Sequence, residues 1–192
     1  MLNYVSSVVR GYTISSRCVR VAAIQYSNDA DAPIQLSSYS DADSLVQAID
    51  GIQFLGGGSN LATALDLLRS QVFASNIIRS NTVQIAIIVT DQLQSSPQIT
   101  DAINRVKSQG ITIVGVAITG PGRVDVNFYN TLISPHPREN CLNQVRDYSQ
   151  LVTGARNLVV RECACLEYTT TTTTTTTTTP RPPAPEPDRK YL

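Results

Sequence analysis

Two short segments carry the residues whose chemistry could form a binding site. In the first, the apolar run over residues 85–89 is followed by Thr90 and the carboxylate of Asp91. A run this short and this rich in β-branched residues predicts a strand buried on both faces. In open α/β sheets, ligands bind just beyond the carboxyl ends of such strands, so Asp91 stands where a site would lie. The alternative is that Asp91 only caps the helix predicted to follow it.

The second segment is Gly-Gly-Gly-Ser-Asn at residues 56–60, which precedes a predicted helix. Its glycines would let the backbone turn sharply and come close to a bound group. A phosphate-binding loop is a weaker interpretation, because the segment lacks both the Lys-Ser/Thr of a P-loop and the Gly-x-Gly-x-x-Gly spacing. The single histidine, His136, lies between two prolines in a polar loop and is expected to be solvated. No motif pairs a serine or cysteine with it, which argues against nucleophilic hydrolysis.

Alternating helices and strands would position these segments. The succession of strand 85–90, helix 98–108 and strand 111–118 is a βαβ unit and therefore indicates a parallel sheet. The predicted fold class is α/β, with a doubly wound, mostly parallel sheet and one antiparallel edge strand. The remaining predicted elements are a helix at 2–9, a hairpin at 19–36, helices starting near Ser40 and Leu61, a short helix at 126–133, a weak strand at 142–145 and a closing helix at 148–160.

Composition excludes some classes of partner. The 15 basic and 15 acidic residues give a formal net charge of zero, and neither sign forms a block, so nucleic acid is not indicated. The longest apolar run, residues 111–118, is too short to span a bilayer, so membrane insertion is not expected. The first residues lack the basic flank and apolar core of a signal peptide.

The C-terminal part of the chain differs from the rest. Residues 169–179 are all threonine, and residues 180–187 are rich in proline. Such a segment has little apolar surface to offset its ordering entropy, and it has the composition of an O-glycosylated stalk. We therefore predict one folded domain over residues 1–165 and a disordered linker over 166–192, in a protein that is secreted or faces outward.

Together, the hairpin, the glycine-rich loop and the strand that ends on Asp91 resemble the von Willebrand factor type A (VWA) domain. The resemblance runs from residue 1 to about Cys163. It includes Val-Ala-Ala-Ile-Gln-Tyr-Ser at residues 21–27 and Asp-Tyr-Ser-Gln-Leu at residues 147–151. It implies a non-enzymatic adhesion module of an extracellular matrix or secreted protein, with collagen or another matrix protein as a possible class of ligand.

The resemblance also implies a metal-ion-dependent adhesion site. In the family a divalent cation, usually Mg²⁺, is held by an Asp-x-Ser-x-Ser loop, a threonine after paired glycines and an aspartate after the central strand. Ser59 stands in the position of the threonine and Asp91 in that of the aspartate, while Gln92 replaces the glycine common after it. This chain has no Asp-x-Ser-x-Ser. Two protein ligands are few for Mg²⁺, so we expect weak binding or none.

By the same resemblance, the first loop and the first central strand would precede the helix at residues 2–9. We therefore expect a domain whose N-terminal part is missing. Loss of a central strand would expose the backbone edges of its two neighbours, through which chains could associate.

Four cysteines, Cys18, Cys141, Cys163 and Cys165, are candidates for disulfides. The resemblance implies that Cys163 pairs with a cysteine before the first strand, which leaves the pairing of the others unassigned. Four reduced thiols are the alternative.

Two other classes of function compete with adhesion. One is a structural spacer of a matrix that binds no ligand through a metal. The other is an intracellular type A domain within a complex, or an enzyme of another kind.

Overall fold

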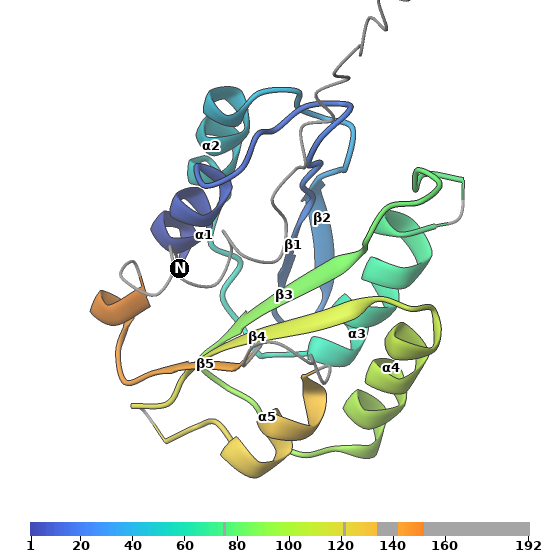
Figure 1. Ribbon diagram of the computed structural model, residues 1–192. Helices are drawn as coiled ribbons and strands as arrows, with labels where there is room; N and C mark the ends of the chain where they lie inside the picture. Colours follow the sequence, from blue (N-terminus) through green and yellow to red (C-terminus); the bar gives the residue numbers. More distant parts are fainter. Residues whose placement is uncertain (75, 121, 134–141, 152–192) are drawn as a thin grey trace, which may run out of the picture.

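The computed structural model describes residues 1–74, 76–120, 122–133 and 142–151, and Figure 1 shows helices and strands alternating along this part of the chain. The α-helices are α1 (Leu2–Val9), α2 (Ala42–Asp50), α3 (Leu61–Leu67), α4 (Pro97–Ser108) and α5 (Val126–Leu132). A π-helix (Leu68–Val72) continues α3, and a 3-10 helix covers Tyr148–Gln150. The strands are β1 (Ala23–Tyr26), β2 (Ala30–Ile34), β3 (Ile85–Thr90), β4 (Thr112–Ile118) and β5 (Leu142–Val145).

The strands form two sheets. The first is the antiparallel hairpin of β1 and β2, and the second is parallel, with β4 between β3 and β5. The predicted α/β class and the predicted parallel sheet are therefore confirmed. Among the described residues no strand pairs with both β1 and β3, which is the position of the central strand that we expect this chain to lack. A side chain bridges these two strands instead: the Tyr26 hydroxyl donates to the Val89 carbonyl at 3.4 Å.

Helices cover both faces of β4, the middle strand of the parallel sheet. In β3, by contrast, Ile87 is 38% exposed, so the prediction that residues 85–89 are buried on both faces is wrong at that residue. In Figure 1, α3 and α4 lie on one side of β3 and β4, and α1 lies on the other. Ile113 of β4 packs in the cluster with α3 and α4, whereas Ile118 packs with Tyr4 and Val8 of α1. Both isoleucines are 0% exposed. A strand covered on both faces has no polar face, which is why β4 is apolar from Ile113 to Ile118.

Helix caps explain where α2 and α4 begin. The Asp41 carboxylate accepts the Ser44 amide at 2.8 Å and caps α2. The sequence places the start of this helix near Ser40, whose hydroxyl could also cap it, so the predicted start is wrong by one residue. The Ser96 hydroxyl accepts the Ile99 amide at 3.2 Å and caps α4, with Pro97 at its first position. Each cap satisfies one amide that has no partner within its helix.

Two predicted elements differ in length. The hairpin strands are shorter than expected: residues 18–22 do not belong to β1, and Val19 forms only an isolated bridge with Ile14. The helix predicted to start near Leu61 changes to π geometry at Leu68. Near this change the Ser70 hydroxyl donates to the Asp66 carbonyl at 2.7 Å. Such a side-chain bond competes with the helical amide for that carbonyl and favours the wider turn.

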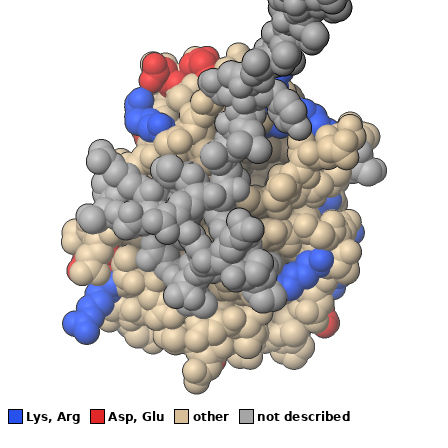
Figure 2. Space-filling model, viewed as in Figure 1, with Lys and Arg blue, Asp and Glu red and all other residues tan. Residues whose placement is uncertain are grey.

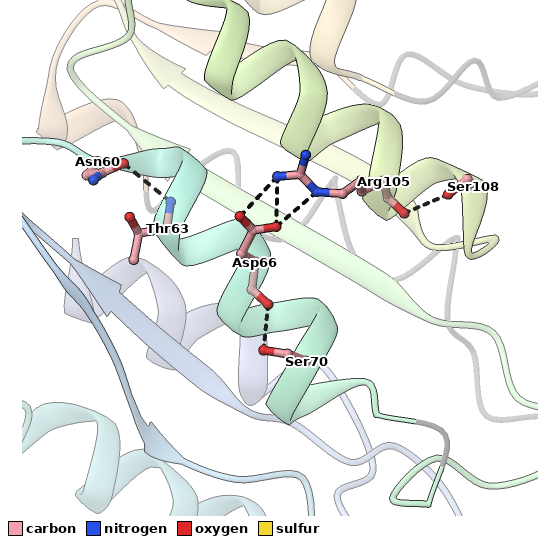
Figure 3. Close-up of polar contacts among 6 residues, drawn as sticks. All are labelled: Asn60, Thr63, Asp66, Ser70, Arg105 and Ser108. Atoms are coloured by element: carbon pink, nitrogen blue, oxygen red, sulfur yellow. Dashed lines mark hydrogen bonds and ion pairs between the residues drawn. The ribbon is translucent and has the colours of Figure 1, made fainter.

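An ion pair joins α3 to α4 on the outside of the sheet. The Arg105 guanidinium donates to both carboxylate oxygens of Asp66, at 2.9 and 3.0 Å through Nη2, as Figure 3 shows. Both side chains are 45% exposed, so solvent screens the pair. We expect it to contribute about 0.2–1 kcal/mol and to fix the relative position of the two helices.

Several predictions concern residues outside the described part. These are His136, the closing helix beyond Leu151, the Thr/Pro linker with its boundary at residue 165, and Cys141, Cys163 and Cys165. Cys18 is disulfide-bonded. The pairing of the four cysteines stays a prediction. No helix among the described residues has the length and apolarity needed to cross a membrane.

Tyr4 gives a testable pH dependence. Its side chain is 1% exposed, and within the described part its hydroxyl has no hydrogen-bond partner. Burial disfavours the phenolate and raises the pKa of Tyr4 from 10.0 to about 12. Because the folded pKa exceeds the unfolded one, this stabilisation is complete below pH 10.0 and is lost as the pH rises towards about 12.

We therefore expect Tyr4→Phe to unfold at the same or slightly higher urea concentration at neutral pH, with a gain of up to about 1 kcal/mol. At about pH 11 the free energy of unfolding of Tyr4→Phe should exceed that of the wild type by more than it does at neutral pH. Far-UV circular dichroism can follow unfolding at both pH values, with Tyr39→Phe as the control. A loss of more than about 1 kcal/mol at neutral pH would mean that the Tyr4 hydroxyl has a partner.

Candidate metal site at the carboxyl ends of the strands

Asp91 lies where the loops after three parallel strands meet. It follows the last residue of β3, and its Oδ2 accepts hydrogen bonds from the Arg123 guanidinium at 2.8 Å and the Tyr148 hydroxyl at 2.7 Å. Arg123 comes from the loop after β4, and Tyr148 follows β5. Asp91 does not cap α4, because Ser96 does, so the capping alternative is wrong.

The glycine-rich loop is held against the turn of the β1–β2 hairpin. Gly56 and Gly57 have φ values of 65° and 88°, which side chains rarely adopt. The Gly58 amide donates to Asn28 Oδ1 at 2.9 Å, and a Cβ on Gly58 would lie 2.7 Å from the same oxygen. Asn60 then caps α3 through the Thr63 amide. The glycines therefore allow the backbone to come close to another group, as the sequence predicts. That group is Asn28, in the turn between β1 and β2.

Ser59 reaches the loop that carries Asp91. Its hydroxyl donates to the Gln92 carbonyl at 3.2 Å, and the Thr90 hydroxyl donates to the same carbonyl at 2.8 Å. The structure thus brings Ser59 to the residue next to Asp91, at the same edge of the sheet. We use the name Asp91 edge for the group of Ser59, Asp91, Arg123 and Tyr148.

Tyr148 of the Asp91 edge and the neighbouring Tyr26 both stay protonated near neutral pH. Burial raises the pKa of Tyr26, and the Asp91 charge adds to this, while hydrogen bonds with Thr90 and Ser59 act against it. Partial burial and the hydrogen bond to Asp91 raise the pKa of Tyr148, with the Arg123 charge opposing. Both hydroxyls are therefore neutral donors, and Arg123 provides the positive charge that faces Asp91.

Sequence reasoning did not identify Arg123, Tyr26 or the role of Tyr148. The signal that points to Asp91 also applies to two of them, because Arg123 and Tyr148 follow the neighbouring parallel strands. Tyr26 is the last residue of β1 and lies beside the same edge. Residues just after the carboxyl ends of the neighbouring strands were thus the candidates that the sequence offered for the site.

The contacts at this edge do not suit a divalent cation. Magnesium takes close to six oxygen ligands in octahedral geometry. The described residues contain no group of three or more His, Cys, Asp or Glu side chains that could hold a metal ion. Asp91 is paired with a guanidinium, and the Ser59 hydroxyl is bonded to a backbone carbonyl. The role of Ser59 and Asp91 as metal ligands stays a prediction. A cation would have to compete with the contacts that these two side chains already make.

Known proteins similar to this chain are matrix proteins. The collagen alpha-6(VI) chain of Homo sapiens is 29% identical over 118 residues, which cover 62% of this chain and 5% of that protein. The collagen alpha-1(XII) chain of Notophthalmus viridescens is 29% identical, covering 84% and 17%. Matrilin-1 of Gallus gallus is 26% identical, covering 76% and 29%. The chain thus spans less than a third of each relative.

Solved structures share the fold at low sequence identity. Proximal thread matrix protein 1 from the mussel byssus, in its second crystal form, has a TM-score of 0.72 at 17% identity, covering 83% of this chain and 41% of that one. A structure of the same protein with a zinc-occupied MIDAS motif has a TM-score of 0.71 at 18% identity, with the same coverage. Manganese-loaded TRAP of Plasmodium vivax has a TM-score of 0.65 at 14% identity, covering 85% and 66%.

The family model for the von Willebrand factor type A domain matches residues 1–156, which is most of the chain. The alternation of helices and strands, the parallel sheet and the position of Asp91 beyond β3 agree with the resemblance seen in the sequence. This chain therefore belongs to the von Willebrand factor type A domain family.

Proposed function

We propose that this chain is a non-enzymatic protein-binding module of an extracellular matrix protein. The observation that carries the proposal is the family match over residues 1–156, together with similarity to collagen and matrilin chains. These relatives are matrix proteins rather than enzymes. A matrix protein such as a collagen is accordingly the class of partner that we propose.

The segment that leads into the glycine-rich loop has features of a protein-binding site. Phe54 is 96% exposed and Leu55 is 51% exposed, immediately before the glycine-rich loop. Exposed aromatic and apolar side chains next to polar groups are common where proteins bind one another. On the face shown in Figure 2, basic and acidic side chains lie in small separate groups, as the zero formal net charge leads us to expect. We therefore propose a protein ligand rather than nucleic acid.

Extracellular placement is part of the proposal. The matrix relatives support it, as do the disulfide-bonded Cys18 and the Thr/Pro composition of residues 166–192. We propose that this segment acts as a stalk that separates the domain from its neighbour. An outward-facing spacer of this composition would let the domain reach ligands in a matrix.

Metal dependence is proposed for complete sites of the family and not for this chain as given. The zinc-occupied and manganese-loaded structures support a divalent cation in other members. In a complete site the Ser59 hydroxyl and the Asp91 carboxylate would be two of the oxygen ligands. The cation would supply a Lewis-acidic position for a carboxylate of the partner.

Surface plasmon resonance tests whether the chain binds matrix proteins. The full chain is passed over immobilised fibrillar collagen, fibronectin and albumin, once with Mg²⁺ and once with EDTA. We expect saturable binding to at least one matrix protein and none to albumin. Phe54→Ala should weaken that binding about ten-fold, because exposed aromatic side chains often dominate protein interfaces.

Val83→Ala is the matched control for Phe54→Ala. Val83 is 79% exposed and lies before β3, at the amino end of the strand and so at the opposite edge of the sheet. Its loss should leave binding within about two-fold of the wild type. A screen that is negative with and without Mg²⁺ would overturn the proposal and favour a structural spacer.

A further inference from the structure

We propose that the Arg123 guanidinium takes the place of a divalent cation in this chain, so that the Asp91 edge offers exposed guanidinium N–H donors to an acidic side chain of a partner. The observation is the ion pair between Arg123 Nη2 and Asp91 Oδ2, at 2.8 Å. Asp91 is the acidic ligand that the sequence predicts for the cation. In this fold, a basic side chain of the same molecule already neutralises it.

Backbone pairing holds Arg123 in position. The Leu93 amide donates to the Arg123 carbonyl at 3.0 Å, and the Asp125 amide donates to the Leu93 carbonyl at 2.8 Å. Gln94 Nε2 also donates to the Arg123 carbonyl, at 2.9 Å. The loops after β3 and β4 are thus joined by a parallel bridge between Leu93 and Val124, next to the ion pair. This anchoring fixes the backbone of Arg123 beside Asp91, so only the side-chain torsions remain to be ordered when the pair forms.

The same contacts compete directly with a cation. Arg123 and Tyr148 both donate to Oδ2 of Asp91, so both lone pairs of that oxygen are engaged. A divalent cation that coordinated this oxygen would lie next to the guanidinium, and the two positive charges would repel each other. Metal binding through Oδ2 would therefore require Arg123 to leave that oxygen, and binding through Oδ1 would still place the cation beside the guanidinium charge.

The exposure of the pair indicates the chemistry of the partner. The Arg123 side chain is 54% exposed and that of Asp91 is 26% exposed. A guanidinium has five N–H donors in a planar fork that suits a carboxylate. An aspartate or glutamate of a partner can therefore meet Arg123 without a bridging metal. This part of the inference rests on the proposed function, whereas the exclusion of the cation does not.

Electron paramagnetic resonance of Mn²⁺ tests the exclusion on the full chain, because the signal of free Mn²⁺ falls as the ion binds. The proteins are the wild type, Asp91→Asn, Arg123→Gln and the double variant Asp91→Asn/Arg123→Gln. We expect no saturable binding by the wild type up to about 1 mM Mn²⁺. Arg123→Gln should show saturable Mn²⁺ binding that the wild type lacks, weak because two protein ligands remain, and the added Asp91→Asn change should abolish it.

Two outcomes would overturn the inference. One is saturable Mn²⁺ binding by the wild type that Asp91→Asn removes. Such binding would show that Arg123 does not keep the cation away from Asp91. The other is an Arg123→Gln protein with the far-UV circular dichroism of the wild type and no gain in Mn²⁺ binding. Since the titration uses no partner protein, its result is independent of whether the chain binds a matrix ligand.

Discussion

Gly120→Ala should lower the free energy of unfolding by about 1–3 kcal/mol and weaken the contact between Tyr148 and Asp91. The Gly120 amide, just beyond β4, donates to the Arg146 carbonyl at 2.9 Å. A Cβ on Gly120 would overlap that carbonyl oxygen. Because the oxygen belongs to the backbone and cannot rotate away, the loops after β4 and β5 must separate. Tyr148 lies in the second of these loops.

Urea unfolding followed by far-UV circular dichroism measures the change, since the chain has no tryptophan. Gly51→Ala is the control: its nearest atoms would lie 3.4 and 3.5 Å from the new Cβ, at an ordinary φ of −81°. It should stay within about 0.5 kcal/mol of the wild type. A double-mutant cycle with Tyr148→Phe should show that this hydroxyl contributes less once Gly120 is replaced. Equal stability of Gly120→Ala and the wild type would contradict the close approach of the two loops.

The parallel sheet was predictable because burial on both faces leaves its mark on the sequence. β4 packs against α1 on one face and against α3 and α4 on the other, so its residues from Ile113 to Ile118 are apolar. The helices beside it show a helical period and clear end signals, such as Ser96 and Pro97 at the start of α4. These are local properties, and each can be inferred from a short stretch of sequence.

The predicted helix boundaries were wrong where two local backbone conformations have similar free energies. Ser40 and Asp41 are both good caps, and the backbone around α2 decides between them. Near the π-helix after α3, the Ser70 hydroxyl donates to the Asp66 carbonyl. This bond does not change the spacing of the apolar residues, so the sequence pattern is the same for an α-helix and a π-helix. Periodicity gives the face of such a helix but not its hydrogen-bond spacing.

The Asp91 edge was predictable only in part. Asp91 was identified because its position depends on the strand before it, which the sequence shows clearly. Arg123 and Tyr148 are 32 and 57 residues away from it, and their contacts depend on the paths of two loops. One of these loops turns at Gly122, where φ is 68°. A glycine signals that such a turn is possible but does not specify which side chain reaches the carboxylate.

Ile118→Ala should be the most destabilising of the substitutions considered, with a loss of about 2–5 kcal/mol. Ile118 is the last residue of β4, is 0% exposed and packs with Tyr4 and Val8 of α1. Removing its three outer carbons would leave a cavity between the sheet and the helix. Since the site loop begins directly after Ile118, the loss should also loosen the support of Arg123.

Urea unfolding can compare Ile118→Ala with Val83→Ala, a substitution of an apolar residue that is 79% exposed and should cost less than about 0.5 kcal/mol. If Ile118→Ala does not fold, Ile118→Val removes a single methylene and should cost about 0.5–1.5 kcal/mol. Similar losses at Ile118 and Val83 would show that α1 does not pack on β4 in solution. The face of the sheet opposite α3 and α4 would then be open, and the apolar run of β4 would need another cover.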